Sequence, residues 1–405
     1  MSWKINRQKE RLRYWRRLRR QRRRRLRSLS TRRRLCYASS SGRERVWFKI
    51  KKHERPFVSQ EGTRGFRLPP SLGAVQKNSL VITLPEVFIF DDNYIESATV
   101  IGIIRRAIEE GHRIGYIDFS RMKHISPACL TVFSCYADLW KQLQPSVKIL
   151  PMTWQVGIFE MFKQIGFIET LGFDSYDKEN VPLSAGLSAA GVKYLGLRKY
   201  SIPTQGEDIG ALVRDIRKDI ECFAGCKFNT QAMFASVTEA ITNIKDHAYA
   251  NEKLGRLPRK WWLSVSLDVV RSLLHIIIFD RGLGIPRTMQ DSSKFSAYRR
   301  LAYSVLANNW AEKDRLFLAF ERTRNEIAGR RAITIKDGHG NGCGDLLQMA
   351  ESASLVDVNN EQGILSVISN NARYTYKASY GVDPGVSRAL KCSLQGTLLE
   401  WRIKI

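Results

Sequence analysis

The chain has 405 residues, enough for two or three domains of roughly 150 residues each, and 66 Lys and Arg against 39 Asp and Glu give it a formal net charge of +27. Its longest apolar stretches, such as Leu273 to Phe279, fall far short of the roughly 20 residues that a membrane span needs, and its first 30 residues lack the apolar core of a secretory signal, so we expect a cytoplasmic protein without a membrane span. Seven cysteines without a C-x-x-C pair argue against a disulfide framework and a zinc ribbon.

A basic arm, residues 1–58, accounts for most of the charge. Its first 55 residues hold 23 Lys and Arg against 3 acids, a net charge of +20, and include the runs Arg22–Arg25 and Arg32–Arg34. Mutual repulsion among these charges predicts a disordered segment when the arm is free. Binding to the phosphate backbone of a nucleic acid is one function for such an arm. A solvated tail, an organelle-targeting segment or a start codon assigned too far upstream explains the same composition.

Residues 75–180 alternate strand-like and helix-like patterns. Short apolar runs are separated by segments whose apolar residues recur every three or four positions, as at Phe133, Tyr136 and Trp140. This order predicts a small α/β domain with parallel strands joined by helical crossovers. The predicted strands are Ser79–Leu84, Gly115–Phe119 and Val147–Leu150, and the predicted helices are Tyr94–Gly111, Ala128–Gln142 and Gln155–Ile165.

Four segments of this region resemble a STAS domain, the module of anti-sigma-factor antagonists and sulfate transporters. They are IGYIDFS at Ile114–Ser120, HISPACL at His124–Leu130, VKIL at Val147–Leu150 and FKQIGFIETLG at Phe162–Gly172. In the antagonists a serine in an acidic turn at the start of a helix is phosphorylated, and the nearest position here is Ser126. Ser126 lacks the acidic neighbour and precedes Pro127. We therefore expect Ser126 to be the N-cap of a helix rather than a phosphorylation site.

Residues 197–405 have the pattern of an α+β sandwich and follow a linker rich in Ser, Ala and Gly, Val181–Gly196. Two helices precede the strands, which predicts helices on one face of a mostly antiparallel sheet. A charged helical stretch, Ala297–Ala328, interrupts the strands. The predicted helices are Asp208–Phe223 and Thr230–Tyr249, and the predicted strands are Trp261–Val269, Leu273–Phe279, Ile364–Ile368, Tyr374–Tyr380 and Thr397–Ile405.

The second of these helices contains the sequence EAITNIKDHA. Its four-residue spacing predicts that Glu239, Asn243 and His247 share one helix face. An amide oxygen such as that of Asn243 suits Mg²⁺, and a carboxylate such as that of Glu239 can polarise a water or hydroxyl for attack on a phosphate. Polar residues at this spacing are also common on a solvated helix face.

Two glycine-rich segments add to this pattern. DRGLGIP, which contains Asp280, follows an apolar strand, and a carboxylate at a strand end can accept a hydrogen bond from an exocyclic amine such as that of adenine. GHGNGCGD precedes the predicted helix Leu346–Ala350, and the backbone N–H groups of such a loop can bind phosphates. The second segment has neither the Lys of a P-loop nor the surroundings of a Rossmann fingerprint.

In this order the motifs resemble those of the GHKL superfamily, which has the Bergerat ATP-binding fold and includes DNA gyrase, heat-shock chaperones, histidine kinases and anti-sigma serine kinases. The matching motifs are ExxxNxxxH on a helix, DxGxGIP after a strand, GxGxGxG before a helix, and Gly396-Thr397 at the last strand. The resemblance spans about Ile209 to Ile405. It implies a Bergerat-fold sandwich behind a STAS-like domain, with ATP and Mg²⁺ as ligands.

The resemblance also implies a role for each motif residue. Asn243 would bind Mg²⁺ and Glu239 would serve as the general base. Asp280 would bind the adenine amine, and Thr397 would support a water network beside it. His247 would contact phosphate or make a structural hydrogen bond. The remaining implied ligands are Gly282 and Gly284 around the base, and Gly338, Gly340, Gly342 and Gly344 at the phosphates.

A long segment between the two glycine motifs, residues 287–337, departs from the short lid of anti-sigma kinases. It contains Arg322, Arg324, Arg330, Arg331 and Lys336, which fit either a contact to the γ-phosphate or a charged helix surface. The long lid favours an ATPase whose closure switches the binding of a protein partner or the formation of a homodimer. A serine/threonine kinase of the anti-sigma type and a nucleotide-gated nucleic-acid-binding protein without turnover are the alternatives.

Overall fold

The computed structural model describes residues 34–38, 45–49, 80–110, 114–143, 148–149, 154–171, 191–204, 206–249, 258–291, 311–327, 342–354, 363–378 and 385–405. The chain divides into two compact units, Met1–Ala74 and Val75–Ile405. In the first unit, strands β1 (Arg34–Ala38) and β2 (Arg45–Lys49) pair as an antiparallel hairpin. The rest of the basic arm lies outside the described residues, and the disorder predicted for the free arm stays a prediction.

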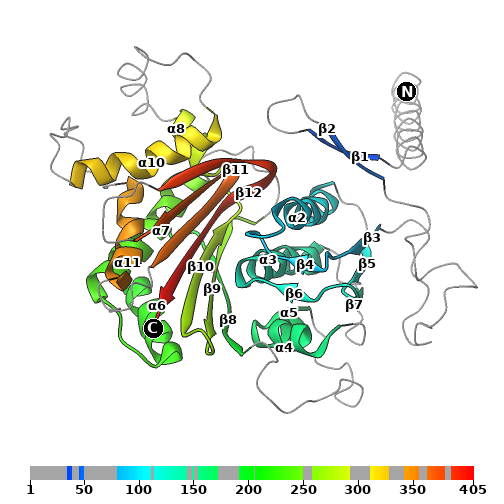
Figure 1. The fold of residues 1–405 in the computed structure, drawn as a ribbon, viewed down its shortest axis with the longest axis horizontal. Helices are drawn as coiled ribbons and strands as arrows, with labels where there is room; N and C mark the ends of the chain where they lie inside the picture. Colours follow the sequence, from blue (N-terminus) through cyan, green and yellow to red (C-terminus); the bar gives the residue numbers. More distant parts are fainter. Residues whose placement is uncertain are drawn as a thin grey trace, which may run out of the picture. The chain divides into compact units, whose positions relative to one another are not determined.

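The second unit begins with an α/β layer (Figure 1). Its elements are β3 (Leu80–Thr83), β4 (Val87–Phe88), α2 (Tyr94–Glu109), β5 (Ile114–Asp118), β6 (His124–Ile125), α3 (Pro127–Leu143), β7 (Lys148–Ile149), α4 (Val156–Gln164) and α5 (Phe167–Leu171). Strands β3, β5 and β7 form a parallel sheet in that order, and β4 pairs in parallel with β6. Helical crossovers join them because parallel neighbours cannot be connected by a tight turn.

Helix α3 begins with the N-cap expected at Ser126. Ser126 Oγ accepts a hydrogen bond from the Cys129 backbone N–H at 3.2 Å, and Pro127 is the first helical residue. All residues from Ala128 to Trp140 are buried, whereas a surface helix would leave one face in water. Helix α3 is therefore packed on every side, and its contacts include the large sheet described next.

The second part of this unit is a five-stranded antiparallel sheet with helices, the α+β arrangement that the pattern predicts. Its strands are β8 (Val192–Ser201), β9 (Lys260–Asp268), β10 (Leu273–Asp280), β11 (Ile364–Lys377) and β12 (Val386–Lys404). Their order across the sheet is β11-β12-β10-β9-β8, so the last strand of the chain lies in the interior of the sheet. Strand β10 pairs along its whole length with β9 and β12, which places Asp280 opposite both Trp261 and Thr397.

The helices of this part lie together on one side of the sheet (Figure 1). They are α6 (Ile209–Ala224), α7 (Thr230–Asn243) with a π-helical turn at Ile244–Ala248, α8 (Ile285–Asp291), α10 (Glu312–Ile327), and α11 (Asp345–Ser354) after a 3₁₀ turn at Gly342–Gly344. The Asp208 carboxylate caps α6 by accepting from the Ala211 N–H at 3.0 Å, and Gly225 ends this helix in the left-handed conformation. None of the helices in the described part of the chain is long and apolar enough to cross a membrane.

The large sheet is buried on both faces, as the apolar sequence of β10 suggests. Leu274, Ile276 and Ile278 contribute to the hydrophobic cluster shared with α6, α7 and α11. Ile277 and Phe279 point the other way, into the cluster of the α/β layer, where the rings of Phe279 and Tyr136 lie 6.2 Å apart. Successive strand residues face opposite sides, so a strand covered on both sides is apolar throughout.

Three local predictions are corrected by the structure. The predicted linker over Val181–Gly196 ends in strand β8, which begins at Val192 as an edge strand. The strands predicted at Ile364–Ile368 and Tyr374–Tyr380 are one strand, β11, because a β-bulge between Ser369 and Ala372 carries the chain through the polar interruption. The helix predicted over Thr230–Tyr249 changes to a π-helical turn after Asn243.

Candidate functional site

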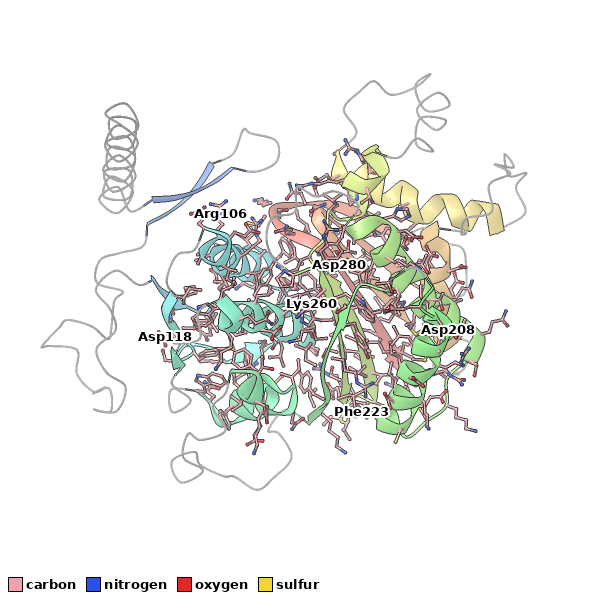
Figure 2. The ribbon with its side chains drawn as sticks, turned by 180° about the vertical axis from the view of Figure 1, so that it is seen from behind. Arg106, Asp118, Asp208, Phe223, Lys260 and Asp280 are labelled. Carbon is pink, nitrogen blue, oxygen red and sulfur yellow. The ribbon has the colours of Figure 1, made fainter. Side chains whose placement is uncertain are left out.

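The carboxyl end of β10 positions the central residue of the candidate site. Asp280, labelled in Figure 2, is the last residue of this strand. Its side chain is 4% exposed. Burial raises the pKa of Asp280 to about 7, although a hydrogen bond from the Gly282 N–H to Oδ1 at 2.7 Å favours its ionised form. The structure therefore holds a carboxylate at the strand end that can change its charge near neutral pH.

The loop after β10 is attached to the end of the α7 segment. The Leu283 N–H donates to the Ala248 carbonyl oxygen at 2.7 Å. Glycine at position 282 lets the loop come this close to Ala248, because a Cβ there would overlap the Ala248 carbonyl group. The π-helical turn and the loop are thus in direct backbone contact, which brings two of the predicted motifs together.

Gly396 and Thr397 lie beside Asp280 on the neighbouring strand β12. Gly396 has φ +91°, and a Cβ on it would overlap the Asp280 carbonyl oxygen. The Thr397 hydroxyl lies 3.1 Å from Ser369 Oγ, and Ser369 Oγ in turn accepts from the Ile285 N–H at 2.9 Å. A chain of hydrogen bonds therefore joins β12, β11 and the loop after β10.

Glu239 and Asn243 lie one helical turn apart on α7, and the Asn243 side-chain N–H donates to Glu239 Oε1 at 2.8 Å. Burial raises the pKa of Glu239 to about 7, opposed by this hydrogen bond and reinforced by the negative charge of Asp345. The bond also turns the Asn243 amide oxygen away from Glu239. A carboxyl group that titrates near neutrality can accept a proton, and the adjacent amide oxygen can contribute to a cation site.

His247 is exposed and belongs to the π-helical turn. The four-residue spacing predicts a shared face only for an α-helix, whereas a π turn bonds residues five apart and so changes the angle between successive side chains. Only Glu239 and Asn243 are brought together in the predicted way.

The start of α11 lies against α7, next to Glu239. Ser236 Oγ donates to the Asp345 carbonyl oxygen at 2.6 Å and accepts from the Met349 N–H at 3.1 Å. Gly342 and Gly344 form the 3₁₀ turn directly before this helix. Gly338 and Gly340 lie outside the described residues, so the structure brings the second half of the predicted phosphate loop, Gly342–Asp345, close to Glu239.

The long segment after the first glycine motif contains helices α8 and α10. Glu312 at the start of α10 accepts from Arg287 Nε at 3.2 Å and from the Asn371 N–H at 2.8 Å, which ties α10 to the loop and to β11. Arg322 and Arg324 belong to α10, but their side chains are not described. Arg330, Arg331 and Lys336 lie outside the described residues.

Comparisons of the chain with protein-family models, with curated proteins and with solved structures find no match. The geometry of the residues themselves is therefore what supports an assignment. Within the described ranges, no group of three or more His, Cys, Asp or Glu side chains is arranged to hold a metal ion. A cation at Asn243 would therefore need most of its ligands from water or from a bound anion. Mg²⁺ sites in proteins are commonly of this kind.

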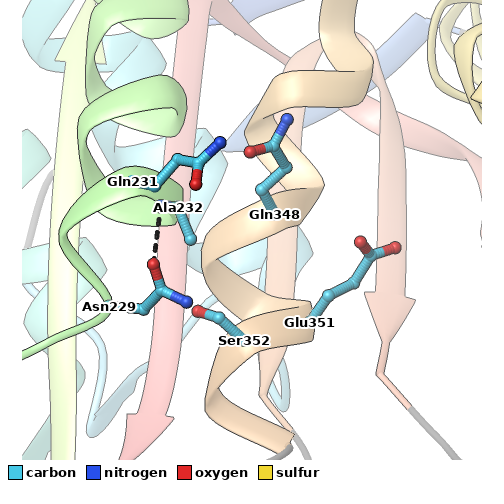
Figure 3. A pocket seen from close by; sticks show the side chains of 6 residues that line it. All are labelled: Asn229, Gln231, Ala232, Gln348, Glu351 and Ser352. Atoms are coloured by element: carbon cyan, nitrogen blue, oxygen red, sulfur yellow. Dashed lines mark hydrogen bonds between the residues drawn. The ribbon is translucent and has the colours of Figure 1, made fainter.

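A shallow hollow of about 270 Å³ lies away from these residues, between the first turn of α7 and α11 (Figure 3). Its lining is mostly polar, and Asn229 there caps α7 by accepting from the Ala232 N–H at 3.1 Å. The hollow is at the opposite end of α7 from Asn243, and none of the predicted site residues lines it. The lining residues are Asn229, Gln231, Ala232, Gln348, Glu351 and Ser352.

Three residues of the site were not predicted from the sequence. Ser369 and Asn370 occupy the bulge of β11 and bond to the loop after β10. Tyr249 follows the π-helical turn, and its hydroxyl accepts from the Arg281 N–H at 3.1 Å while donating to the Lys260 carbonyl oxygen at 2.5 Å. The polar residues Ser369, Asn370 and Asn371, which follow the apolar pair Val367–Ile368, were the available signal.

Proposed function

We propose that residues 197–405 form a Bergerat-type domain of the GHKL superfamily that binds ATP with Mg²⁺ and hydrolyses it, and that residues 75–180 form a STAS-like domain attached to it. The observation that carries the proposal is the surrounding of Asp280. A buried carboxylate lies at a strand end, accepts a hydrogen bond from the N–H of the loop residue Gly282, and faces Thr397 on the neighbouring strand. This arrangement suits a flat base that carries an exocyclic amine.

In this proposal Asp280 accepts a hydrogen bond from the adenine amine. Gly282 and Gly284 let the loop beside the base pack closely against Ala248 and Asn370. Thr397 and Ser369 order the polar edge of the base pocket. The N–H groups of the Gly342–Gly344 turn, at the amino end of α11, favour phosphate oxygens. Mg²⁺, when bound at Asn243, would neutralise phosphate charge.

Glu239 is the proposed general base. Water attacks the γ-phosphorus, the bond to the β-phosphate oxygen breaks, and Glu239 takes the proton of the water, giving ADP and phosphate. The raised pKa of Glu239 supports this role, because a base that titrates near the working pH is well matched to proton transfer. Residues 287–337 are the proposed lid. The hydrogen bonds from Arg287 and from the Asn371 N–H to Glu312 support it, because they connect α10 to the loop after Asp280 and to β11. Movement of this lid would change the surface presented to a protein partner.

A serine/threonine kinase is the second candidate, because the same base would activate a hydroxyl as readily as water. The attached α/β layer favours it by its resemblance to substrates of anti-sigma kinases. In Ser126, however, the hydroxyl is engaged in capping α3. A nucleotide-gated protein without turnover, acting on nucleic acid through the basic arm, is the third.

One experiment separates these functions. The full chain is incubated with Mg²⁺ and γ-labelled ATP, and both free phosphate and protein-bound label are measured. We expect free phosphate. Label on Ser or Thr would favour the kinase, retention of intact ATP would favour gated binding, and failure to bind ATP at all would contradict the assignment.

A further inference from the structure

Asn370 has an unusual backbone for its position. Within the described ranges, only Ser272 (φ +49°) and Asn370 (φ +53°) are non-glycine residues with positive φ. Ser272 lies in the turn between β9 and β10, where such conformations are common. Asn370 instead lies inside β11, at the bulge where the register with β12 shifts. A left-handed residue inside a strand calls for a local explanation.

The Asn370 side chain points to the loop after β10. It is 1% exposed, and its Nδ2 atom donates to the Leu283 carbonyl oxygen at 2.7 Å. Gly284, with φ +83°, leaves room for this amide, because a Cβ there would overlap Nδ2. The preceding residue, Ser369, accepts from the Ile285 N–H. Two consecutive bulge residues thus hold both ends of the three-residue segment Leu283–Ile285.

Stability alone gives little reason for this arrangement. The left-handed backbone costs Asn less than most residues with a Cβ, but the Asn370 Oδ1 atom finds no hydrogen-bond partner among the described residues. A buried amide that is only half satisfied costs free energy relative to an apolar side chain. Strain of this kind is concentrated at sites that need a fixed geometry.

We propose that Asn370 is a positioning residue that holds Leu283–Ile285 at the distance from Asp280 and Thr397 that a flat adenine base requires. The inference rests on the proposed nucleotide site and deepens it. The loop follows Asp280 directly, so a shift of Leu283 or Gly284 would move the backbone relative to the carboxylate that the proposal assigns to adenine. Asn370 acts on the base through the loop and does not itself touch the reacting phosphate.

The test compares Asn370→Gly with Ser272→Gly in the full chain. Glycine keeps a left-handed backbone without strain, so each variant removes a side chain and little else. Affinities for ATP and GTP are measured by calorimetry, and hydrogen exchange of the peptide containing Leu283–Ile285 is measured without nucleotide. We expect Asn370→Gly to weaken ATP binding by about tenfold, to lower the preference for ATP over GTP, and to speed exchange in the loop. Ser272→Gly should leave all three unchanged.

Asn370→Asp gives a second arm, since a carboxylate of the same shape cannot donate to the Leu283 carbonyl oxygen. It should resemble Asn370→Gly. If both variants keep the wild-type ratio of ATP affinity to GTP affinity, the positioning role is overturned, even where both affinities fall. A wild-type chain that binds no ATP would overturn the nucleotide site as well, and the exchange measurement would then show whether Asn370 still holds the loop.

Discussion

Asp280 and Glu239 are two buried carboxyl groups whose pKa values are both raised to about 7. In each case burial is the main cause, because a charged carboxylate is poorly solvated inside the protein. They lie on different elements and have different neighbours: Asp280 accepts from backbone N–H groups, and Glu239 accepts from the Asn243 amide. In the proposed function, titration of Asp280 would change the affinity for ATP, and titration of Glu239 would change the rate of hydrolysis.

Asp280→Asn should weaken ATP binding. Both carboxylate oxygens can accept hydrogen bonds, and one already accepts from the Gly282 N–H. An amide would have to turn its NH₂ group toward either this donor or the adenine amine, so we expect a loss of about tenfold to 100-fold in affinity. Calorimetric titration with ATP measures it.

Asp118→Asn is the matched control, because Asp118 is also buried at a strand end and accepts from the N–H two residues later, at Ser120. Equal losses in the two variants would show that the effect is structural.

Hydrolysis should rise with pH through the pKa of Glu239. The base must be deprotonated to take a proton, so activity is expected to increase between about pH 6 and pH 8. Glu239→Gln should lower the rate by about 100-fold and remove this pH dependence, while ATP still binds. Phosphate release at several pH values measures it, with Glu221→Gln on α6 as the control. A pH profile that is unchanged in Glu239→Gln would assign the titration to another group.

The π-helical turn and the β11 bulge are the two irregular elements that build the site. An uninterrupted α-helix would end with a different set of exposed carbonyl groups, whereas the π turn directs the Ala248 carbonyl to the Leu283 N–H. A regular β11 would carry Ser369 and Asn370 on opposite faces, whereas the bulge lets both bond to the same loop. The loop is therefore held from two sides.

Gly396→Ala should be strongly destabilising. Gly396 combines a left-handed backbone with direct contact to the Asp280 carbonyl group, and neither the backbone of β12 nor that of β10 can move without disturbing the ladder. We expect a loss of about 3 kcal/mol or more in the free energy of unfolding.

Gly225→Ala measures the cost of a left-handed backbone at alanine without a steric contact. Gly225 also has positive φ, but nothing lies within 4 Å of the position that a Cβ would take there, so a cost of about 1 kcal/mol is expected. Urea unfolding of both variants measures the difference, and similar costs would exclude the steric contact as the cause.

The α/β layer and the large sheet are joined by charges as well as by apolar contact. Asp91, just before α2, pairs with Arg373 of β11 and with Arg402 of β12, the latter at 3.0 Å. Arg402 also lies near Glu400, which accepts from His275 of β10 when that ring nitrogen is protonated. Arg373 follows closely after the β11 bulge, so one stretch of β11 contacts both the candidate site and the α/β layer.

Asp91→Ala should destabilise the folded chain by about 3 kcal/mol at neutral pH, because it leaves the buried Arg373 without its carboxylate. The neighbouring arginines lower the pKa of Asp91, opposing the effect of burial. A lowered pKa means that the contribution of Asp91 is present above its ordinary pKa and is lost as the pH falls through the lowered value. The difference in free energy of unfolding between the wild type and Asp91→Ala should therefore become smaller at acidic pH.

Urea unfolding at neutral and acidic pH measures this difference. Glu86→Ala, which removes the exposed partner of Lys123, should have a much smaller effect. A difference for Asp91→Ala that is independent of pH would contradict the role of the ion pair.

Local patterns in the sequence were enough for the elements that depend on near neighbours. These elements are the N-cap at Ser126, helix α6 and the apolar strand β10, which follow from interactions within a few residues. Such signals are short in range, and periodicity reports them directly. The roles predicted for Glu239, Asn243, Asp280 and Thr397 depend in addition on the resemblance of the ordered motifs to those of the GHKL superfamily.

Features that depend on distant partners appeared only in the tertiary structure. Strand β8 is an edge strand with a weak apolar pattern, and its pairing with β9 was needed to recognise it. The bulge at Ser369–Asn370 follows from contacts with Leu283 and Ile285, more than 80 residues earlier in the chain. The burial of the sheet on both faces depends on docking of the α/β layer. Local periodicity carries no information about such partners, because their effect arises only when remote segments pack together.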